Sequence, residues 1–167
     1  IGDYRTVHRH KRDDVSFSLL ANEMGTPLFV KPANLGSSVG ISKVDTADEY
    51  KAALDEAFLY DTKVVVEAFL EGREIEVAVL GNEDPIASLP GEVVPHHEFY
   101  SYEAKYIDEQ GAGLEIPAKL TDEQVSSVQE LAIESFQALC CEGMARVDFF
   151  LSPDGRFVMN EINTIPG

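Results

Sequence analysis

The sequence contains no tryptophan, only two cysteines and few basic residues. The cysteines, Cys140 and Cys141, are adjacent, and adjacent cysteines rarely bridge, so a disulfide framework is excluded. The chain has 13 Lys and Arg residues against 30 Asp and Glu residues, a formal net charge of −17 at pH 7. Binding to a nucleic-acid backbone or an anionic membrane needs a positive surface, so we expect neither as a partner.

Long apolar runs are also missing. No stretch approaches the roughly 18 apolar residues that a membrane-spanning helix needs, and no signal peptide is recognisable. Reduced thiols and the absence of export signals favour a cytoplasmic protein. The sequence begins with Ile1 rather than Met and stops at Gly167 directly after a strand-like run, so we interpret it as a piece of a longer protein.

Hydrophobic periodicity predicts an α+β fold with a mostly antiparallel sheet. Thr46 with Glu49 and Thr121 with Gln124 form capping boxes that open two amphipathic helices. Short alternating runs between them predict strands, several of which are joined as hairpins. The polar first residues, 1–14, are expected to be a solvated linker.

Residues 95–119 show no clear element. A structureless stretch of this length in a compact domain is usually a functional lid or is disordered. It is rich in aromatic residues, from Phe99 to Tyr106, whereas disordered linkers are poor in them. We therefore favour a lid.

The last hairpin carries polar residues at strand spacing. Arg146 and Asp148 are two residues apart and share one strand face, as do Glu161 and Asn163 on the returning strand. If the hairpin turns at residues 152–155, Asp148, Glu161 and Asn163 can converge. Three oxygen ligands without His or Cys suit Mg²⁺ or Mn²⁺, and Arg146 would hold an anion beside them. The alternative is a polar face open to solvent.

Lys31 follows a buried strand and precedes the loop Gly36–Gly40. Backbone N–H groups of a glycine-rich loop can cradle phosphate, and a lysine adds a positive charge. An ordinary hairpin turn is the alternative, because the loop matches neither a Walker A loop nor a dinucleotide fingerprint. Together with the acidic hairpin, Lys31 and this loop indicate a site for a nucleotide with Mg²⁺.

Three further residues are candidates for the same site. Glu67 ends a buried strand and Glu74 begins the next, so the short connection between them resembles a hinge that grips an adenine and a ribose. Lys105 lies in the lid and could close over phosphates. The alternative for Glu74 and for Lys105 is an ordinary surface side chain.

Four segments, in this order, resemble the D-alanine–D-alanine ligases. They are Val30–Lys43, Gly72–Asn82, Phe99–Tyr106, and the pair Ala145–Phe150 and Asn160–Gly167. The resemblance implies an ATP-grasp fold, with two α+β lobes of mostly antiparallel sheets. It also implies the lobe boundaries: a linker at 1–14, a central lobe at 15–73 and a C-terminal lobe at 74–167.

The resemblance implies an activity as well. ATP phosphorylates the carboxylate of one D-alanine, and the amine of a second D-alanine attacks the acyl phosphate, giving D-alanyl-D-alanine for bacterial peptidoglycan. The implied cofactors are ATP and two Mg²⁺ (or Mn²⁺) ions, and the family is commonly homodimeric. Because the N-terminal domain of the family and the segment after Gly167 are missing, we expect the isolated piece to be inactive.

The resemblance assigns residue roles by motif position. It implies that Arg146 and the Gly167 N–H stabilise an oxyanion. It implies phosphate contacts for Lys31, Ser37, Ser38 and Lys105, and a role for Tyr106 in closing the lid near Ser37. The implied adenine and ribose contacts are Glu67, Ala68, Phe69, Leu70 and Glu74, with Phe99 and Asn160 as further nucleotide contacts. The implied metal ligands are Asp148, Glu161 and Asn163.

Three alternatives stay open from the sequence. The acceptor could be D-lactate or D-serine instead of D-alanine. The chain could belong to another ATP-grasp ligase that joins a different carboxylate and amine. It could also be a non-catalytic nucleotide-binding module, although Arg146 beside a metal site would then have no purpose.

Overall fold

Two separate hydrophobic clusters organise the chain into two α+β units. The computed structural model describes residues 1–35, 39–95 and 112–165. These residues form an N-terminal unit, Gly2–Leu70, and a C-terminal unit, 71–95 and 112–165. The division falls after Leu70, whereas the sequence predicted it after Arg73. The predicted α+β architecture with antiparallel sheets is confirmed.

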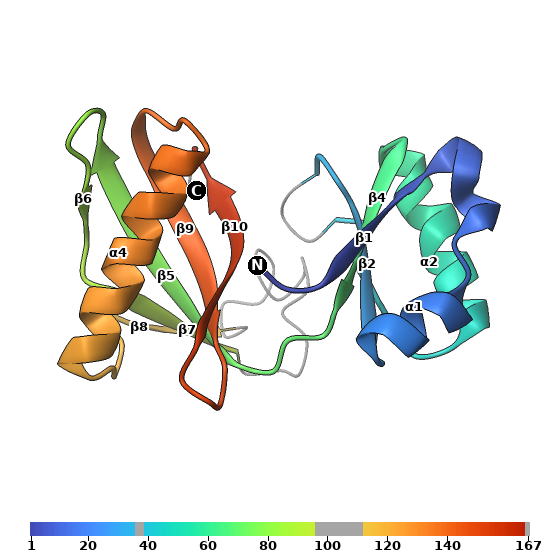
Figure 1. The fold of residues 1–167 in the computed structure, drawn as a ribbon, viewed down its shortest axis with the longest axis horizontal. Coiled ribbons are helices and arrows are strands. Elements are labelled where there is room, and N and C mark those ends of the chain that lie inside the picture. Colours follow the sequence, from blue (N-terminus) through green and yellow to red (C-terminus); the bar gives the residue numbers. More distant parts are fainter. Residues whose placement is uncertain (36–38, 96–111, 166–167) are drawn as a thin grey trace. The chain divides into compact units, whose positions relative to one another are not determined.

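The N-terminal unit is a sheet covered on one face by helices (Figure 1). Its elements are β1 (Tyr4–His8), the 3-10 helix η1 (Arg9–Asp14), α1 (Phe17–Met24), β2 (Leu28–Pro32), β3 (Ser42–Val44), α2 (Ala47–Tyr60) and β4 (Lys63–Ala68). The strands pair in the order β1-β4-β2-β3, and these pairings are antiparallel. Alternate residues of β2 and β4, such as Val30 and Val66, are buried against Leu54 and Ala57 of α2.

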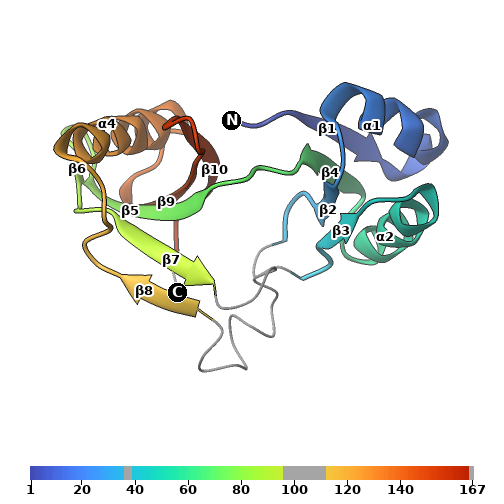
Figure 2. The ribbon, with the colours of Figure 1, turned by 90° about the horizontal axis from the view of Figure 1, so that it is seen from below.

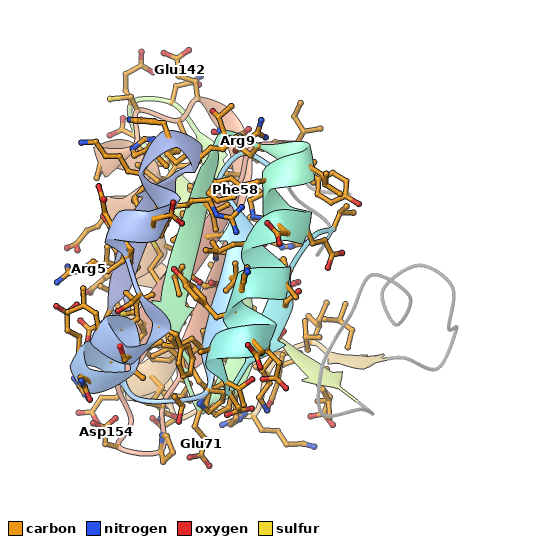
Figure 3. The ribbon with its side chains drawn as sticks, turned by 90° about the vertical axis from the view of Figure 1, so that its right-hand side faces the viewer. Arg5, Arg9, Phe58, Glu71, Glu142 and Asp154 are labelled. Atoms are coloured by element: carbon orange, nitrogen blue, oxygen red, sulfur yellow. The ribbon has the colours of Figure 1, made fainter. Side chains whose placement is uncertain are left out.

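The expectation of a linker over residues 1–14 is wrong for Tyr4–Asp14. β1 pairs with β4 along its whole length, and Val7 is buried in the core. The guanidinium of Arg9 donates to the carbonyls of Phe58 and Asp61 at the end of α2 and lies over the Phe58 ring (Figure 3). Arginine therefore satisfies carbonyls that the helix end leaves unpaired, a use of charge that composition alone does not reveal.

The C-terminal unit is a sheet with one helix across a face (Figure 2). Its elements are β5 (Arg73–Gly81), β6 (Ile86–Ala87), β7 (Gly91–Pro95), β8 (Ala112–Glu115), α4 (Asp122–Ala138), β9 (Gly143–Leu151) and β10 (Phe157–Asn163). The strand order is β10-β9-β5-β7-β8, and β6 pairs with β5. Val128, Ala132 and Phe136 of α4 are fully buried against alternate residues of β5 and β9.

One strand lies inside the stretch that the sequence left without structure. β8 pairs with β7, so part of residues 95–119 belongs to the sheet. β8 contains Gly113, the exposed Leu114 and the partly exposed Glu115, and such a short edge strand lacks a clear alternating pattern. Residues 96–111 of the predicted lid lie outside the described residues.

Capping fixes where the two longer helices begin. Thr46 accepts a hydrogen bond from the Glu49 backbone, and Thr121 accepts one from Gln124, so both predicted capping boxes are confirmed. Each cap contributes about 1 kcal/mol to helix stability. Among the described residues, no helix is long and apolar enough to cross a membrane. In each unit the helices occupy one face of the sheet, and we call the opposite face the helix-free face.

Candidate functional site

Strand alternation places charged residues on the helix-free face of the C-terminal sheet. Val147 and Phe149 of β9 are buried beneath α4, so Arg146 and Asp148 point to the opposite face. On β5, the burial of Ile75 and Val77 likewise puts Glu74 and Glu76 on the face of Arg146. The pairing of β5 with β9 sets Glu76 directly opposite Asp148.

A β-bulge on β10 brings the other two predicted ligands to the same face. Met159 pairs with Phe149, but the next pair is Glu161 with Asp148, so Asn160 is the extra residue. A bulge shifts the alternation by one residue. Phe157, Met159 and Ile162 therefore all pack against the core, and Glu161 and Asn163 lie on the helix-free face. Without the bulge, Asp148 would face Asn160 and Glu161 would point toward the core.

Arg146, Asp148 and Asn163 form one hydrogen-bonded network. The guanidinium of Arg146 donates to both carboxylate oxygens of Asp148, with Nε to Oδ1 at 2.7 Å and one terminal nitrogen to Oδ2 at 2.8 Å. The amide nitrogen of Asn163 donates to Oδ2 of Asp148 at 3.0 Å. Nε of Arg146 also lies 3.4 Å from Oε1 of Glu76. The structure thus brings the predicted residues together and adds Glu76 to them.

The arginine is strongly held in its charged form. Its hydrogen bonds to Asp148 are the largest influence and raise the pKa of Arg146, while partial burial opposes that shift. The charges of Asp148, Glu76 and Glu161 raise the pKa further. Arg146 is therefore a permanent cation inside an acidic group of side chains, ready to pair with an anion that reaches this face.

The donor set fits a hard divalent cation that is only partly coordinated by protein. Among the described residues, no three His, Cys, Asp or Glu side chains are grouped as a metal site, and the predicted set has just two acids plus the amide of Asn163. Mg²⁺ is typically held by one or two carboxylates together with substrate phosphates, rather than by a complete protein cage. Asp148 and Glu161, paired across β9 and β10, match that requirement.

Glu74 stands at the other end of the same face. It lies opposite Phe150 on β9 and opposite Val93 on β7, so an aromatic and an aliphatic residue flank its carboxylate. A carboxylate bordered by apolar surface suits a ligand with both hydroxyl groups and a flat ring. Sequence reasoning missed Phe150, although strand parity with Asp148 would have placed it on this face.

The N-terminal sheet carries a second group of predicted residues on its helix-free face. Lys31 Nζ lies 2.7 Å from Oε2 of Glu67, and both side chains are partly buried, at 23% and 30% exposure. Strand alternation explains the meeting, because Val30 and Val66 are buried on the other face. The predicted phosphate-binding lysine is therefore held in place by one of the predicted adenine-site residues.

Aromatic residues border this ion pair. The ring of Phe29 stacks on that of Phe69 with centroids 6.2 Å apart, and Lys43 Nζ lies 5.5 Å from the Phe69 centroid. Phe29 pairs with Glu67 on one side and Lys43 on the other. Sequence reasoning missed Phe29 and Lys43, yet Phe29 is two residues before Lys31 and so had to share its face. A flat apolar base fits such a surface.

Several predicted residues are placed without a contact that defines a role, or lie outside the described residues. Ala68 is the last residue of β4, Leu70 the last of the N-terminal unit, and Asn160 is exposed in the bulge of β10. The predicted residues outside the described part of the chain are Ser37, Ser38, Phe99, Lys105, Tyr106 and Gly167.

Comparisons with known proteins identify the family to which this chain is similar. A family profile described as "D-ala D-ala ligase C-terminus" matches residues 1–167. A D-alanine--D-alanine ligase from Oceanobacillus iheyensis is 54% identical over 164 residues, 98% of this chain and 44% of that protein. D-alanine--D-alanine ligase A from Escherichia coli strain K12 is 50% identical over 167 residues, 100% of this chain and 46% of that protein.

Solved structures of similar ligases also match this chain. The D-alanine-D-alanine ligase from Coxiella burnetii matches with a TM-score of 0.86 and 39% identity, over 100% of this chain and 43% of that one. The VanG D-Ala:D-Ser ligase from Enterococcus faecalis matches with a TM-score of 0.89 and 36% identity, over 100% and 48%. The predicted ATP-grasp fold is thereby confirmed, and the chain spans less than half the length of these relatives. The chain belongs to the D-alanine–D-alanine ligase family and corresponds to the C-terminal part of its members.

Proposed function

We propose that the whole protein containing this chain joins two D-alanines at the expense of ATP and so supplies D-alanyl-D-alanine for peptidoglycan. The observation that carries the proposal is the network of Arg146, Asp148 and Asn163, with Glu161 paired opposite Asp148. It combines oxygen ligands for a divalent cation with a fixed positive charge, which is what phosphoryl transfer needs. The relatives of 50% and 54% identity carry the name of this activity.

The first step would be phosphoryl transfer. A carboxylate oxygen of the first D-alanine attacks the γ-phosphorus of ATP, the bond to the β-phosphate breaks, and an acyl phosphate and ADP result. Lys31, Ser37, Ser38 and Lys105 would bind phosphate oxygens, and Asp148, Glu161 and Asn163 would hold two Mg²⁺ ions. Bound Mg²⁺ would neutralise phosphate charge.

The second step would form the peptide bond. The amine of the second D-alanine attacks the acyl carbonyl and loses a proton, and the tetrahedral intermediate collapses with release of phosphate. Arg146 and the Gly167 N–H would stabilise the oxyanion of that intermediate. Loss of one such donor typically costs on the order of 100-fold in turnover, so we expect at least that from Arg146→Ala. Tyr106 would close the lid near Ser37.

Further residues would contact the nucleoside. Glu74 would accept hydrogen bonds from the ribose hydroxyls, and Glu67, Ala68, Phe69 and Leu70 would surround the adenine. Phe99 and Asn160 would add further contacts to the nucleotide. The stacked rings of Phe29 and Phe69 support this assignment, since an aromatic surface next to Lys31 suits a base followed by phosphates.

The direct test is phosphate release by the whole protein with ATP, Mg²⁺ and a panel of D-alanine, D-serine and D-lactate. We expect release with D-alanine alone, with D-alanyl-D-alanine as the product identified by mass spectrometry. Glu161→Gln should lower this release by at least on the order of 100-fold while the fold persists. Glu134→Gln, an exposed acid on α4, is the matched control. Release that is indifferent to every amino acid would favour a nucleotide-binding module instead.

A D-serine acceptor is the second candidate. It is favoured by the match to the VanG D-Ala:D-Ser ligase, at 36% identity. We rank it below D-alanine because the relatives named D-alanine--D-alanine ligase are 50–54% identical. The panel separates the two, since the mixed dipeptide would appear only when both D-alanine and D-serine are present.

We also propose a cytoplasmic location and a homodimer for the whole protein. Cys140 and Cys141 are free thiols, which suits a reducing compartment. Fractionation of the cells and sedimentation of the purified whole protein test the location and the dimer separately.

A further inference from the structure

Glu76 has no role in the proposed function, although it lies among the residues that do. It pairs with Asp148 across β5 and β9, and Asp148 pairs with Glu161 across β9 and β10. The three carboxylates therefore form one row across three strands on the helix-free face. Glu76 is partly buried, with 25% of its side chain exposed.

Arg146 reaches toward Glu76 as well as toward Asp148. Its cross-strand neighbours are Asn163 on β10 and Ala78 on β5. The small side chain of Ala78 leaves room for the guanidinium to extend over β5, where Nε lies 3.4 Å from Oε1 of Glu76. The bonds to Asp148 are shorter, so Asp148 is the main partner in the absence of ligands.

A bound cation would change that balance. Both oxygens of Asp148 accept hydrogen bonds from Arg146 or Asn163, and the proposed function requires Asp148 oxygens as metal ligands. A carboxylate oxygen turned to Mg²⁺ is a weaker acceptor for the guanidinium, because the cation repels that positive charge. Ala78 offers Arg146 no polar replacement, whereas Glu76 offers a carboxylate one strand away.

We propose that Glu76 is a positioning residue: it takes over the guanidinium of Arg146 when Asp148 binds the cation and keeps it aimed at the reacting carbonyl. This inference rests on the proposed function, because it assumes that Asp148 is a ligand and that Arg146 meets the oxyanion. It assigns no contact between Glu76 and substrate. A purely structural role for Glu76, or a role as an additional metal ligand, would be different and is separable by experiment.

The experiment uses the whole protein with Glu76→Gln, Glu76→Asp and the control Glu134→Gln. Glu76→Gln removes the charge, and we expect kcat to fall by about 10-fold while KM for ATP changes by less than about 2-fold, since an orienting contact acts on the transition state. Glu76→Asp keeps a carboxylate and should recover part of that loss. It also keeps the test valid if Glu76→Gln fails to fold in thermal unfolding.

Two measurements without turnover complete the test. Mn²⁺ binding with a non-hydrolysable ATP analogue, followed by electron paramagnetic resonance, should be unchanged in Glu76→Gln. In the corresponding Mg²⁺ complex, NMR should show the Arg146 Nε–H protected from solvent exchange in the wild type and exchanging faster in Glu76→Gln. The Arg146 signal is assigned by its loss in Arg146→Lys.

The outcomes separate cleanly. A kcat for Glu76→Gln equal to that of Glu134→Gln, or unchanged Nε–H exchange, overturns the inference. A loss of Mn²⁺ affinity of about 10-fold or more also overturns it, because Glu76 would then be a ligand. If the wild-type protein neither releases phosphate nor binds the nucleotide analogue with Mn²⁺, the proposed function itself has failed.

Discussion

Both units place their helices on one face of an antiparallel sheet, and they differ in what the opposite face carries. The N-terminal face pairs one lysine, Lys31, with one carboxylate, Glu67, beside stacked aromatic rings. The C-terminal face surrounds one arginine, Arg146, with the carboxylates of Asp148 and Glu76. The same layered architecture thus presents two different faces, a lysine–carboxylate pair beside stacked rings on one sheet and an arginine among carboxylates on the other.

Both units have a hydrophobic core between the sheet and its helices. Phe136→Ala in α4 should lower the free energy of unfolding by about 3–5 kcal/mol, because it empties a fully buried site in the core that α4 forms with β5 and β9. Leu54→Ala in α2 should cost about 2–5 kcal/mol for the same reason in the N-terminal core. Denaturant unfolding measures both losses.

Hydrogen exchange tests whether each unit has its own core. If each unit has its own core, Phe136→Ala should speed the exchange of amides in β5 and β9 and leave β2 and β4 unchanged. Leu139→Ala, an exposed residue at the end of the same helix, is the control and should cost less than about 1 kcal/mol. Equal acceleration in both units would contradict the description of two separate cores.

The N-terminal core contains the ionisable side chain of Tyr50, whereas the buried residues described in the C-terminal core include no ionisable side chain. Burial raises the pKa of Tyr50 to about 12, and the charge of Arg12 opposes this. The phenol ionises near pH 10 in the unfolded chain. Its stabilising contribution is therefore complete below pH 10 and is lost as the pH rises to 12, by about 2–3 kcal/mol in total.

Tyr50→Phe tests this alkaline loss. The variant loses the hydrogen bond from the hydroxyl to the Val15 carbonyl, which costs about 1 kcal/mol at pH 7. Between pH 10 and 11 its stability should then fall less steeply than that of the wild type in denaturant titrations. Tyr60→Phe, at an exposed position, should follow the wild type throughout. Identical slopes for all three proteins would refute the assignment to Tyr50.

The difference between the helix-free faces predicts a split in kinetics. Lys31→Met should raise KM for ATP by about 10-fold and change kcat less, because a lysine that holds phosphate in both ground and transition states contributes uniform binding. Substitutions at Glu161 should act mainly on kcat. Lys51→Met, an exposed lysine on α2, is the matched control. A KM for Lys31→Met equal to that of the control would remove Lys31 from the nucleotide site.

Helix starts and the strand face of some site residues could be predicted from the sequence, because local rules decide them. The capping boxes at Thr46 and Thr121 began helices as expected. Strand alternation was enough to put Arg146 and Asp148 on one face of their strand. These features depend on neighbours in the sequence or on the two-residue period of a strand.

Other features of the fold and of the candidate site depend on which strands pair, and a sequence pattern does not predict that pairing. The convergence of Asp148 with Glu161 requires the bulge at Asn160, and regular pairing from the same turn would have sent Glu161 to the core. The place of β1 in the N-terminal sheet follows from pairing with β4, far along the chain. Glu76 and Lys43 were missed because their significance comes only from the strands beside them.

The proposed function depends most on a divalent cation that Asp148, Glu161 and Asn163 would hold together with a nucleotide. The most direct measurement is Mn²⁺ binding to the whole protein in the presence of a non-hydrolysable ATP analogue, compared between wild type, Glu161→Gln and the control Glu134→Gln. We expect Glu161→Gln to weaken Mn²⁺ binding by about 10-fold or more while the control binds like the wild type. Equal Mn²⁺ affinity in all three proteins would contradict it.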